Sequence, residues 1–156
     1  MLTVAVQEDR FDDWSGLLTL LQDAFAYMEA RIDPPSSLRL LNETTIIEKA
    51  GEETLLLARE EGRLVGCCFL KDMGSKMYLG KLAVSKAAQH SGIGLALVNF
   101  AIELCRKEGK QLIELQSRVE LTEVHDFFRH RGFQQTGATA HAGYDRPTSI
   151  TMQLAL

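Results

Sequence analysis

The hydrophobic positions in the first third of the chain predict a strand followed by an amphipathic helix. Leu2 to Gln7 alternates between apolar and polar residues, which is typical of a strand. A stripe with three- and four-residue spacing then predicts a helix, and it consists of Trp14, Leu17, Leu18, Leu21, Phe25 and Met28. Pro34-Pro35 ends this helix because proline has no backbone N–H to donate. A weaker helix is predicted from Leu38 to Ala50.

The middle of the chain predicts three strands joined by tight turns. Thr54 to Arg59 and Arg63 to Leu70 are rich in strand-forming residues, and Glu60-Glu61-Gly62 joins them as a hairpin. A third strand runs from Lys76 to Ser85, and its apolar residues change from odd to even positions: Met77 and Leu79, then Leu82 and Val84. An extra residue near Gly80-Lys81, a β-bulge, would return them to one face. Burial of both faces is the alternative explanation.

The last part of the chain predicts two helices and three strands. One helix carries the stripe Ile93, Leu97, Phe100, Ala101 and Leu104 and ends at Gly109. A second helix starts with Thr122 as its N-cap and ends at Gly132. The strands are expected at Gln111 to Gln116, Phe133 to Thr139 and Thr148 to Leu154. The predicted fold is α/β: an antiparallel meander feeds one β-α-β crossover whose two strands are parallel, all within one domain of residues 1–156.

The composition of the chain limits the kinds of molecule that we expect it to bind. The chain has 156 residues, 46% of them hydrophobic, and a formal net charge of −4, so we expect no binding to nucleic acid or to an anionic membrane. Cys67, Cys68 and Cys105 cannot all pair and show no metal-binding spacing, so we expect free thiols and no metal. Neither a signal peptide nor a membrane-spanning stretch is apparent, which favours a cytoplasmic location.

A glycine-containing loop between a strand and a helix carries the chemistry. Leu82-Ala83-Val84 ends the third strand, and Gln89 to Gly94 leads into the next helix. Unpaired N–H groups at a helix N-terminus attract anions, and Gly92 and Gly94 let the backbone approach one closely, so the loop suits a pyrophosphate. It lacks the third glycine of a dinucleotide fingerprint and the Gly-Lys-Ser/Thr of a P-loop. Close helix–strand packing is the alternative role for these glycines.

Two segments resemble the GNAT acetyltransferases. Val84 followed by Gln89-x-x-Gly92-x-Gly94 is similar to motif A of that family, and Leu121 to Phe133 resembles its later helix, which ends in Gly-Phe. The resemblance follows motif order and spacing along nearly the whole chain. It implies a mixed central sheet with helices on both faces, which splays between the bulged strand and the next parallel strand.

The resemblance also implies a site for acetyl-CoA. Pantetheine would pair with the backbone of residues 82–84, pyrophosphate would lie on the amides of residues 89–94, and the later helix would border the thioester. The implied contacts are Leu82, Ala83, Val84, Gln89, His90, Ser91, Gly92, Ile93, Gly94, Leu95, Phe127 and Phe128. The expected reaction is direct transfer of an acetyl group to a primary amine, more often a small metabolite than a protein. The alternatives are a non-catalytic acyl-CoA-binding module of the same fold and an unrelated nucleotide-binding domain.

The catalytic groups depart from the family pattern. A backbone N–H near Leu82 or Ala83 is the expected oxyanion donor. Phe128 stands where many relatives have a tyrosine that protonates the thiolate, and Val124 stands where they often have asparagine. Replacement candidates lie in the loop of residues 141–147: Tyr144 as a proton donor, and His141 or Asp145 as an acceptor. An exposed hairpin loop is the alternative. Tyr78, Glu114, His125 and His130 are interpreted as ordinary strand or helix-surface residues.

The acceptor side is expected at residues 31–37, after the first helix. Arg31 could hold a carboxylate and Asp33 an ammonium, as an amino-acid-like amine would require. A cation at a helix C-terminus followed by a capped turn is the alternative. Similar proteins commonly dimerise through their last strands, so a homodimer is a further expectation.

Overall fold

The computed structural model describes residues 1–89 and 91–156, and a seven-stranded sheet lies at its centre. The strands are β1 (Leu2–Val6), β2 (Thr54–Glu60), β3 (Arg63–Asp72), β4 (Lys76–Val84), β5 (Leu112–Arg118), β6 (Gln134–Thr139) and β7 (Ser149–Ala155). Their order across the sheet is β1-β2-β3-β4-β5-β7-β6. Within the described residues, β4 and β5 pair in parallel and the other neighbouring pairs are antiparallel. The predicted meander and crossover are confirmed.

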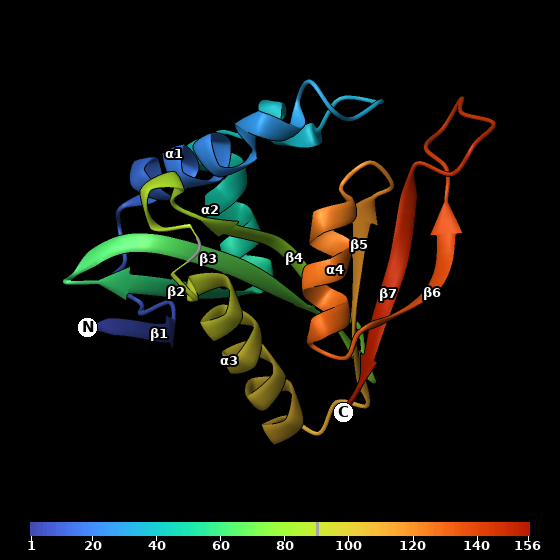
Figure 1. Ribbon diagram of the computed structural model, residues 1–156. Coiled ribbons are helices and arrows are strands. Elements are labelled where there is room, and N and C mark those ends of the chain that lie inside the picture. The colour runs from blue at the N-terminus through green and yellow to red at the C-terminus, as the bar shows by residue number, and fades with distance from the viewer. Residues whose placement is uncertain (90) are drawn as a thin grey trace.

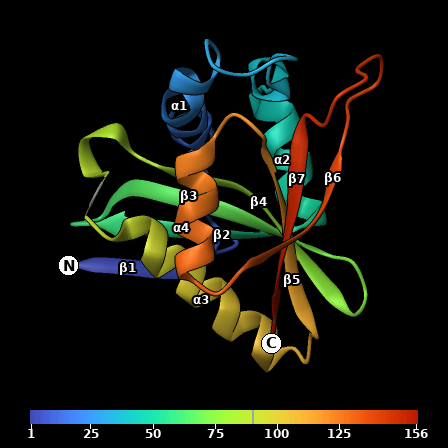
Figure 2. The ribbon, with the colours of Figure 1, turned by 45° about the vertical axis from the view of Figure 1, so that its right-hand side comes forward.

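Helices cover both faces of the sheet (Figures 1 and 2). They are α1 (Trp14–Phe25), α2 (Glu43–Glu52), α3 (Ile93–Lys107) and α4 (Thr122–His130), with 3-10 turns at Ala26–Met28, Ser37–Leu40 and Lys86–Ala88. Alternate residues of β3 separate the two layers of the core: Phe69 packs with Leu17 of α1, and Cys68 packs with Leu97 of α3. The expected mixed sheet with helices on both faces is therefore confirmed.

A β-bulge in β4 explains the change in its apolar alternation. Phe69 of β3 lies opposite Gly80 and Cys67 lies opposite Ala83, so Lys81 and Leu82 together face the single residue Cys68. Lys81 has a φ of 50°, in the left-handed region. The apolar residues before and after the bulge all belong to the α3 side of the core: Met77, Leu79, Leu82 and Val84. The predicted bulge is confirmed, and the extra residue is what keeps these side chains on one face.

Strands β4 and β5 separate beyond a short parallel contact. Their pairing extends from Lys76–Leu112 to Tyr78–Glu114. Beyond it β4 continues to Val84 and β5 continues to Arg118 with no register pair between them among the described residues. In Figure 1 the two strands lie together near the C-terminus and diverge toward α1. The splay that the resemblance implied is present, and it leaves one edge of β4 unpaired.

Three helix boundaries differ from the sequence prediction. The first helix is α-helical to Phe25 and continues only as a 3-10 turn to Met28. The helix expected from residue 38 to residue 50 is two elements, because Asn42 starts a new helix with a capping box: its side chain accepts from the N–H of Thr45, and the Thr45 hydroxyl accepts from the N–H of Asn42. Thr122 is not an N-cap but the first residue of α4, and Leu121 precedes it.

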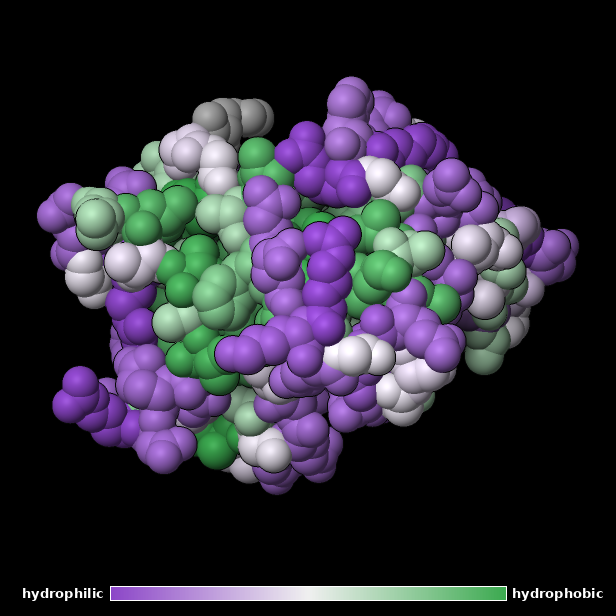
Figure 3. All heavy atoms as spheres, turned by 90° about the horizontal axis from the view of Figure 1, so that it is seen from below, coloured by the Kyte–Doolittle hydropathy of each residue, from purple (hydrophilic) through white to green (hydrophobic). Residues whose placement is uncertain are grey.

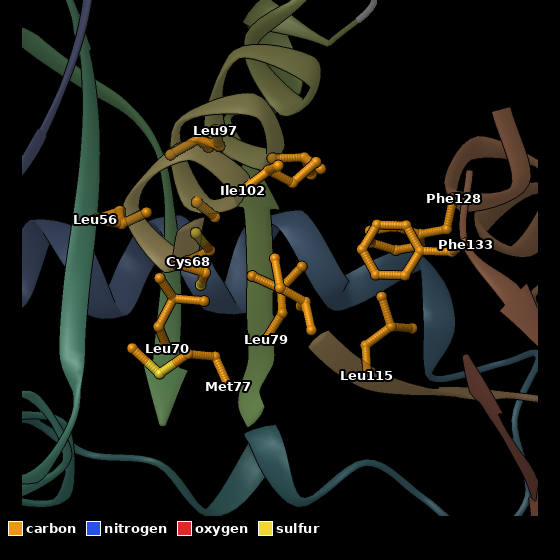
Figure 4. Close-up of a cluster of buried hydrophobic side chains, with 14 of the residues drawn as sticks. Leu56, Cys68, Leu70, Met77, Leu79, Leu97, Ile102, Leu115, Phe128 and Phe133 are labelled. Carbon is orange, nitrogen blue, oxygen red and sulfur yellow. The ribbon is translucent and has the colours of Figure 1, made fainter. Parts of the chain in front are cut away.

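The α3 side of the core joins the sheet to α4. Figure 4 shows Phe128 and Phe133 pointing toward Leu115 and Leu79. Phe128 is 4% exposed, and its ring makes edge contacts with Phe127 and Phe133 at centroid distances of 5.1 and 5.2 Å. Aromatic edge contacts of this kind fix ring orientation as well as burying surface. The side of α4 beside the β4–β5 split is therefore mainly apolar.

The outer surface is mixed in polarity. Seen from below, a ridge of polar residues crosses the middle, and apolar residues lie to either side of it (Figure 3). In the part of the chain that the structure describes, no helix has the length and apolarity needed to cross a bilayer. All three cysteines are buried and free.

Candidate functional site

A cavity of about 630 Å³ opens where β4 and β5 separate. Among the described residues, its lining comes from the C-terminal end of α1 with the 3-10 turn after it, the bulged half of β4 with the loop after it, the first turn of α3, the end of β5, and one side of α4 with the residue before it. The cavity therefore passes from the α3 side of the sheet, through the split, to the α1 side. Such a passage lets two molecules meet from opposite faces.

The first turn of α3 forms one end of the cavity. Gly92 is the N-cap residue, with a φ of 83°, and it makes no side-chain capping bond. A Cβ at Gly92 would meet nothing within 4 Å, and a Cβ at Gly94 would meet Phe127 and Val84 at an ordinary 3.7 Å. Tight helix–strand packing occurs instead at Gly66, whose Cβ would lie 3.0 Å from Ile93. Close packing thus explains neither Gly92 nor Gly94. A left-handed turn explains Gly92, and access of a ligand to the backbone explains both glycines.

The cavity gathers most of the residues that the resemblance assigned to acetyl-CoA. From β4 and the loop after it come Leu82, Ala83, Val84 and Gln89. From the two helices come Gly92, Ile93, Gly94, Leu95, Phe127 and Phe128. Ser91 is not among the lining residues and its hydroxyl donates to the carbonyl of Ala88. His90 lies outside the described residues.

The α4 wall offers no hydroxyl to this cavity. Its lining residues are Glu123, Val124, Phe127 and Phe128, of which Glu123 alone is polar. Glu123 is held by Arg31, whose two terminal nitrogens donate to its carboxylate at 2.5 and 2.9 Å. This pairing, led by the hydrogen bonds from Arg31, lowers the pKa of Glu123 to about 2. The carboxylate is therefore ionised and engaged at neutral pH.

The loop of residues 31–37 is tied to the β5–α4 connection. Arg31 also donates to the carbonyl of Glu120 at 3.1 Å, and Arg118 donates to the carbonyls of Pro34 and Pro35 at 2.7 and 3.2 Å. Arg118 and Glu123 both line the cavity. The loop thus borders the α1 side of the cavity, while Arg31 and Asp33 are not among its lining residues.

Asp33 and Tyr144, two residues singled out from the sequence, meet in the structure. The Tyr144 hydroxyl donates to Asp33 at 2.6 Å, and Arg146 donates to the same carboxylate at 3.1 Å. The hydrogen bond to Asp33 is the main cause that raises the pKa of Tyr144. His141 lies apart from them, with its backbone N–H and its ring bonded to the Thr148 hydroxyl. Neither Tyr144 nor His141 is among the residues that line the cavity.

Two residues interpreted as ordinary surface groups have specific partners. His125 is buried rather than on the helix surface, and its Nε2 lies 2.9 Å from the carbonyl oxygen of Arg118. Its spacing from Leu121 and Phe128 placed it on the apolar stripe, so the pattern contained the signal. Glu114 accepts from Lys76 at 3.1 Å and from Gln153 at 2.7 Å, which ties β4, β5 and β7 together.

Lys81 is one of the lining residues that the hydrophobic pattern did not single out as part of a site, as are Arg118 and Glu123. It lies in the bulge, is half-buried and contributes to the cavity together with Gly80 and Leu82. Burial is the main cause that lowers its pKa, followed by the positive charge of Lys49. The alternation of β4 predicted where the bulge lies, but a bulge residue belongs to neither face, so the pattern did not give the direction of its side chain.

The sequence model of the acetyltransferase (GNAT) family matches residues 14–133. The chain belongs to this family of acetyltransferases. Among curated proteins, none is similar enough in sequence to be matched to this chain. Within the part of this GNAT protein that the structure describes, no three His, Cys, Asp or Glu residues group in a way that could hold a metal ion.

Solved structures share the fold over their whole length at low identity. The PaiA N-acetyltransferase of Thermoplasma acidophilum, in complex with coenzyme A, has a TM-score of 0.84 at 15% identity, covering 99% of both chains. The ribosomal-protein-S18-alanine N-acetyltransferase of Escherichia coli has a TM-score of 0.74 at 19% identity, covering 99% of this chain and 94% of its own. A GNAT acetyltransferase of Elizabethkingia anophelis with acetyl-CoA bound has a TM-score of 0.72 at 17% identity, covering 99% and 98%.

Proposed function

We propose that this protein transfers an acetyl group from acetyl-CoA to a primary amine, and that the amine attacks the thioester directly. The observation that carries the proposal is the cavity in the β4–β5 split, which is lined by the N-terminus of α3 and also by residues at the end of α1 and the turn after it. A direct transfer needs both molecules in one passage with their reacting atoms in contact. The cavity has that form.

The donor end suits coenzyme A by its backbone. The first turn of α3 would hold the pyrophosphate, because its N–H groups lack partners within the helix and glycine occupies two of its positions. The unpaired edge of β4 would bond the amides of pantetheine as a further strand does. Two similar structures are complexes with coenzyme A and acetyl-CoA, which supports this assignment. All of the contacts to coenzyme A that the resemblance implies, Ser91 and His90 included, stay predictions.

The bulge would supply the oxyanion donor. Leu82 has no register partner on β3, whereas Ala83 lies opposite Cys67. A backbone N–H in this stretch, aimed at the thioester oxygen, would stabilise the charge that develops there during attack. Phe128 cannot protonate the departing thiolate, since phenylalanine has no hydroxyl.

The acceptor end favours a small amine with an apolar body. Ala24, Phe25, Met28, Leu121 and Val124 line it, with Arg118 and Glu123 at its polar edge. Arg31 and Asp33 would serve the acceptor by positioning the loop that borders this end, because both already have partners. A single domain over residues 1–156, a cytoplasmic location and a homodimer built through β6 and β7 remain our predictions for this chain.

Thermal unfolding with acetyl-CoA, coenzyme A, ATP and NAD tests the donor assignment. Acetyl-CoA at about 100 times its dissociation constant should stabilise the protein by about 2.7 kcal/mol, a rise of roughly 5–10 °C in Tm. Gly92→Val should abolish that rise by straining the left-handed N-cap. Gly109→Val is the matched control, because Gly109 has a φ of 76° at the other end of α3 and an open Cβ position.

The panel also separates the alternatives. A rise with acetyl-CoA that Gly92→Val loses and Gly109→Val keeps supports the donor site, and an amine screen for released coenzyme A then tests catalysis. Binding with no turnover on any amine would favour a non-catalytic acyl-CoA-binding module. A larger rise with ATP or NAD would favour a nucleotide-binding domain and overturn the proposal.

A further inference from the structure

Lys81 occupies an unusual position for a lysine. It is a non-glycine residue with a φ of 50° inside a strand, at a bulge where the β3–β4 ladder has no partner for it. A left-handed conformation costs a side-chain-bearing residue on the order of 1–2 kcal/mol. Glycine would avoid this strain, yet the chain places here a residue with a long side chain, which is half-buried and belongs to the cavity lining. Strain held at a cavity wall points to a use for the side chain.

The surroundings of Lys81 disfavour its charge. The pKa of Lys81 responds to the charge of Lys49 on α2 and to that of Glu53, the residue before β2. Cys67 on β3 is the third nearby titratable group. Lys49 already binds Glu53 at 2.6 Å, so the nearby carboxylate is occupied. Burial raises the pKa of the Cys67 thiol to about 12, which leaves that group uncharged. Among the described residues, the Lys81 ammonium has no hydrogen-bond or ion-pair partner. Its pKa is lowered because burial and Lys49 outweigh Glu53 and Cys67.

The other titratable side chains that line the described cavity cannot accept a proton well at neutral pH. Glu123 is bound by Arg31, and its pKa of about 2 makes it a weak base. Burial raises the pKa of Tyr27, which therefore stays protonated. Arg118 presents a guanidinium, which has hydrogen-bond donors and no acceptor. Lys81 differs from all three in that burial and the nearby charge of Lys49 lower its pKa, which moves the residue toward the neutral amine that can accept a proton.

We propose that Lys81 is the general base that deprotonates the acceptor ammonium, and this inference rests on the proposed acetyl transfer. The neutral Lys81 amine takes one proton from the acceptor nitrogen, whose lone pair then forms the C–N bond at the thioester carbon. The C–S bond breaks and its electron pair stays on sulfur. A second proton leaves the nitrogen and protonates the thiolate. Lys81 returns its proton to solvent, so the products are an amide, a free thiol and one released proton.

The position of Lys81 fits this role. It directly precedes Leu82, the residue whose unpaired backbone we assign to the oxyanion, so the base and the oxyanion donor are neighbours in the chain and both residues line the cavity. General bases contribute about 10²–10⁴-fold to rate, and lysines do so when their pKa approaches the working pH. Phe128 has no hydroxyl and leaves proton transfer to other groups of the cavity, of which Lys81 is one.

Three variants test the role through kcat and its pH dependence, with an amine that the wild-type protein acetylates. We expect Lys81→Met to lower kcat by roughly 10²–10³-fold. Its remaining rate should rise continuously with pH, where the wild-type rate levels off above the pKa of Lys81. Lys81→Arg should not restore the rate, because guanidinium cannot act as a base. Lys71→Met is the control, since Lys71 is exposed on β3 and should retain wild-type kcat. All variants should keep the acetyl-CoA-induced rise in Tm.

The inference is overturned if Lys81→Met keeps more than a third of kcat, or if Lys81→Arg restores it, since charge alone would then suffice. NMR titration of the Lys81 side chain in the acetyl-CoA complex gives an independent measurement, with Lys81→Met assigning the signal. A pKa at or above that of ordinary lysines would also overturn the role. If no amine is acetylated, the proposed function fails, and the titration still decides whether Lys81 is available as a base.

Discussion

The two ends of the cavity differ in whether backbone or side chains form them. The donor end consists mainly of backbone: the unpaired edge of β4, a left-handed N-cap at Gly92 and the first turn of α3. The acceptor end consists of side chains that come from α1, β5 and α4, with a loop at its border that is held by Arg31 and Arg118. Under the proposed acetyl transfer, the backbone would hold acetyl-CoA and the side chains would hold the amine.

This difference has a physical basis. A backbone site needs only a strand end, a permissive glycine and a helix, and these are local features of the sequence. A side-chain site needs residues far apart in the chain: Arg31 and Glu123, which are 92 positions apart, define the acceptor border by their pairing. No local sequence pattern predicts such a pair.

The largest effect is expected from a substitution that fills the donor end of the cavity and so prevents acetyl-CoA from binding. Gly94→Val places a branched side chain between Phe127 and Val84, where a Cβ already lies 3.7 Å from each. We expect a loss of acetyl-CoA affinity of about 100-fold or more by calorimetry, because the backbone can no longer approach the pyrophosphate. Gly51→Val is the control, since it carries the same helix penalty in α2 with open space around it. Equal affinity in the two variants would mean that the donor does not lie along α3.

Much of the fold was predictable because its signals are local. The alternation of β4 gave the bulge, and Gly109 and Gly132, with φ of 76° and 98°, follow α3 and α4 as expected of C′ glycines. The start of α2 was missed although Asn42 and Thr45 have the spacing of a capping box. The order β5-β7-β6 could not be predicted, because strand pairing depends on contacts between distant residues.

Part of the cavity lining was predictable for the same reason. The residues assigned to coenzyme A from motif spacing mostly line the cavity, since the motif fixes the backbone path. Lys81 was missed because a bulge interrupts the alternation that assigns side chains to faces. His125 was predicted to lie on the helix surface because histidine is a polar residue. Its position in the helix, however, lies on the buried stripe.

Breaking the acceptor end should have a smaller and separate effect. Glu123→Gln removes the charge that holds Arg31, so the bordering loop loosens and KM for the amine should rise about 10-fold with acetyl-CoA affinity unchanged. Amine titrations at saturating acetyl-CoA measure this. Glu103→Gln is the control, because it removes a comparable carboxylate from an exposed ion pair on α3. A matching loss of acetyl-CoA affinity in Glu123→Gln would contradict the separation of the two ends.

The ion pair between Arg31 and Glu123 also makes the stability of the fold depend on pH. The pKa of Glu123 falls from an ordinary 4.5 to about 2 in the folded protein, so the pair stabilises the fold above pH 4.5 and this contribution is lost as pH falls toward 2. Glu123→Gln should reduce the difference in Tm between pH 5 and pH 2.5. Because both side chains are substantially exposed, the effect should shrink in high salt.

The smallest expected effect belongs to the Asp33–Tyr144 contact, and it separates a positioning role from proton donation. Tyr144 donates to Asp33 at 2.6 Å and does not line the cavity, so Tyr144→Phe should lower kcat less than threefold and raise KM for the amine slightly. Asp33→Asn should behave alike, because both variants weaken one anchor of the same loop. Steady-state kinetics across pH decide the matter. If Tyr144→Phe instead slowed turnover about 100-fold while Asp33→Asn was nearly unaffected, Tyr144 would be the acid that protonates the thiolate.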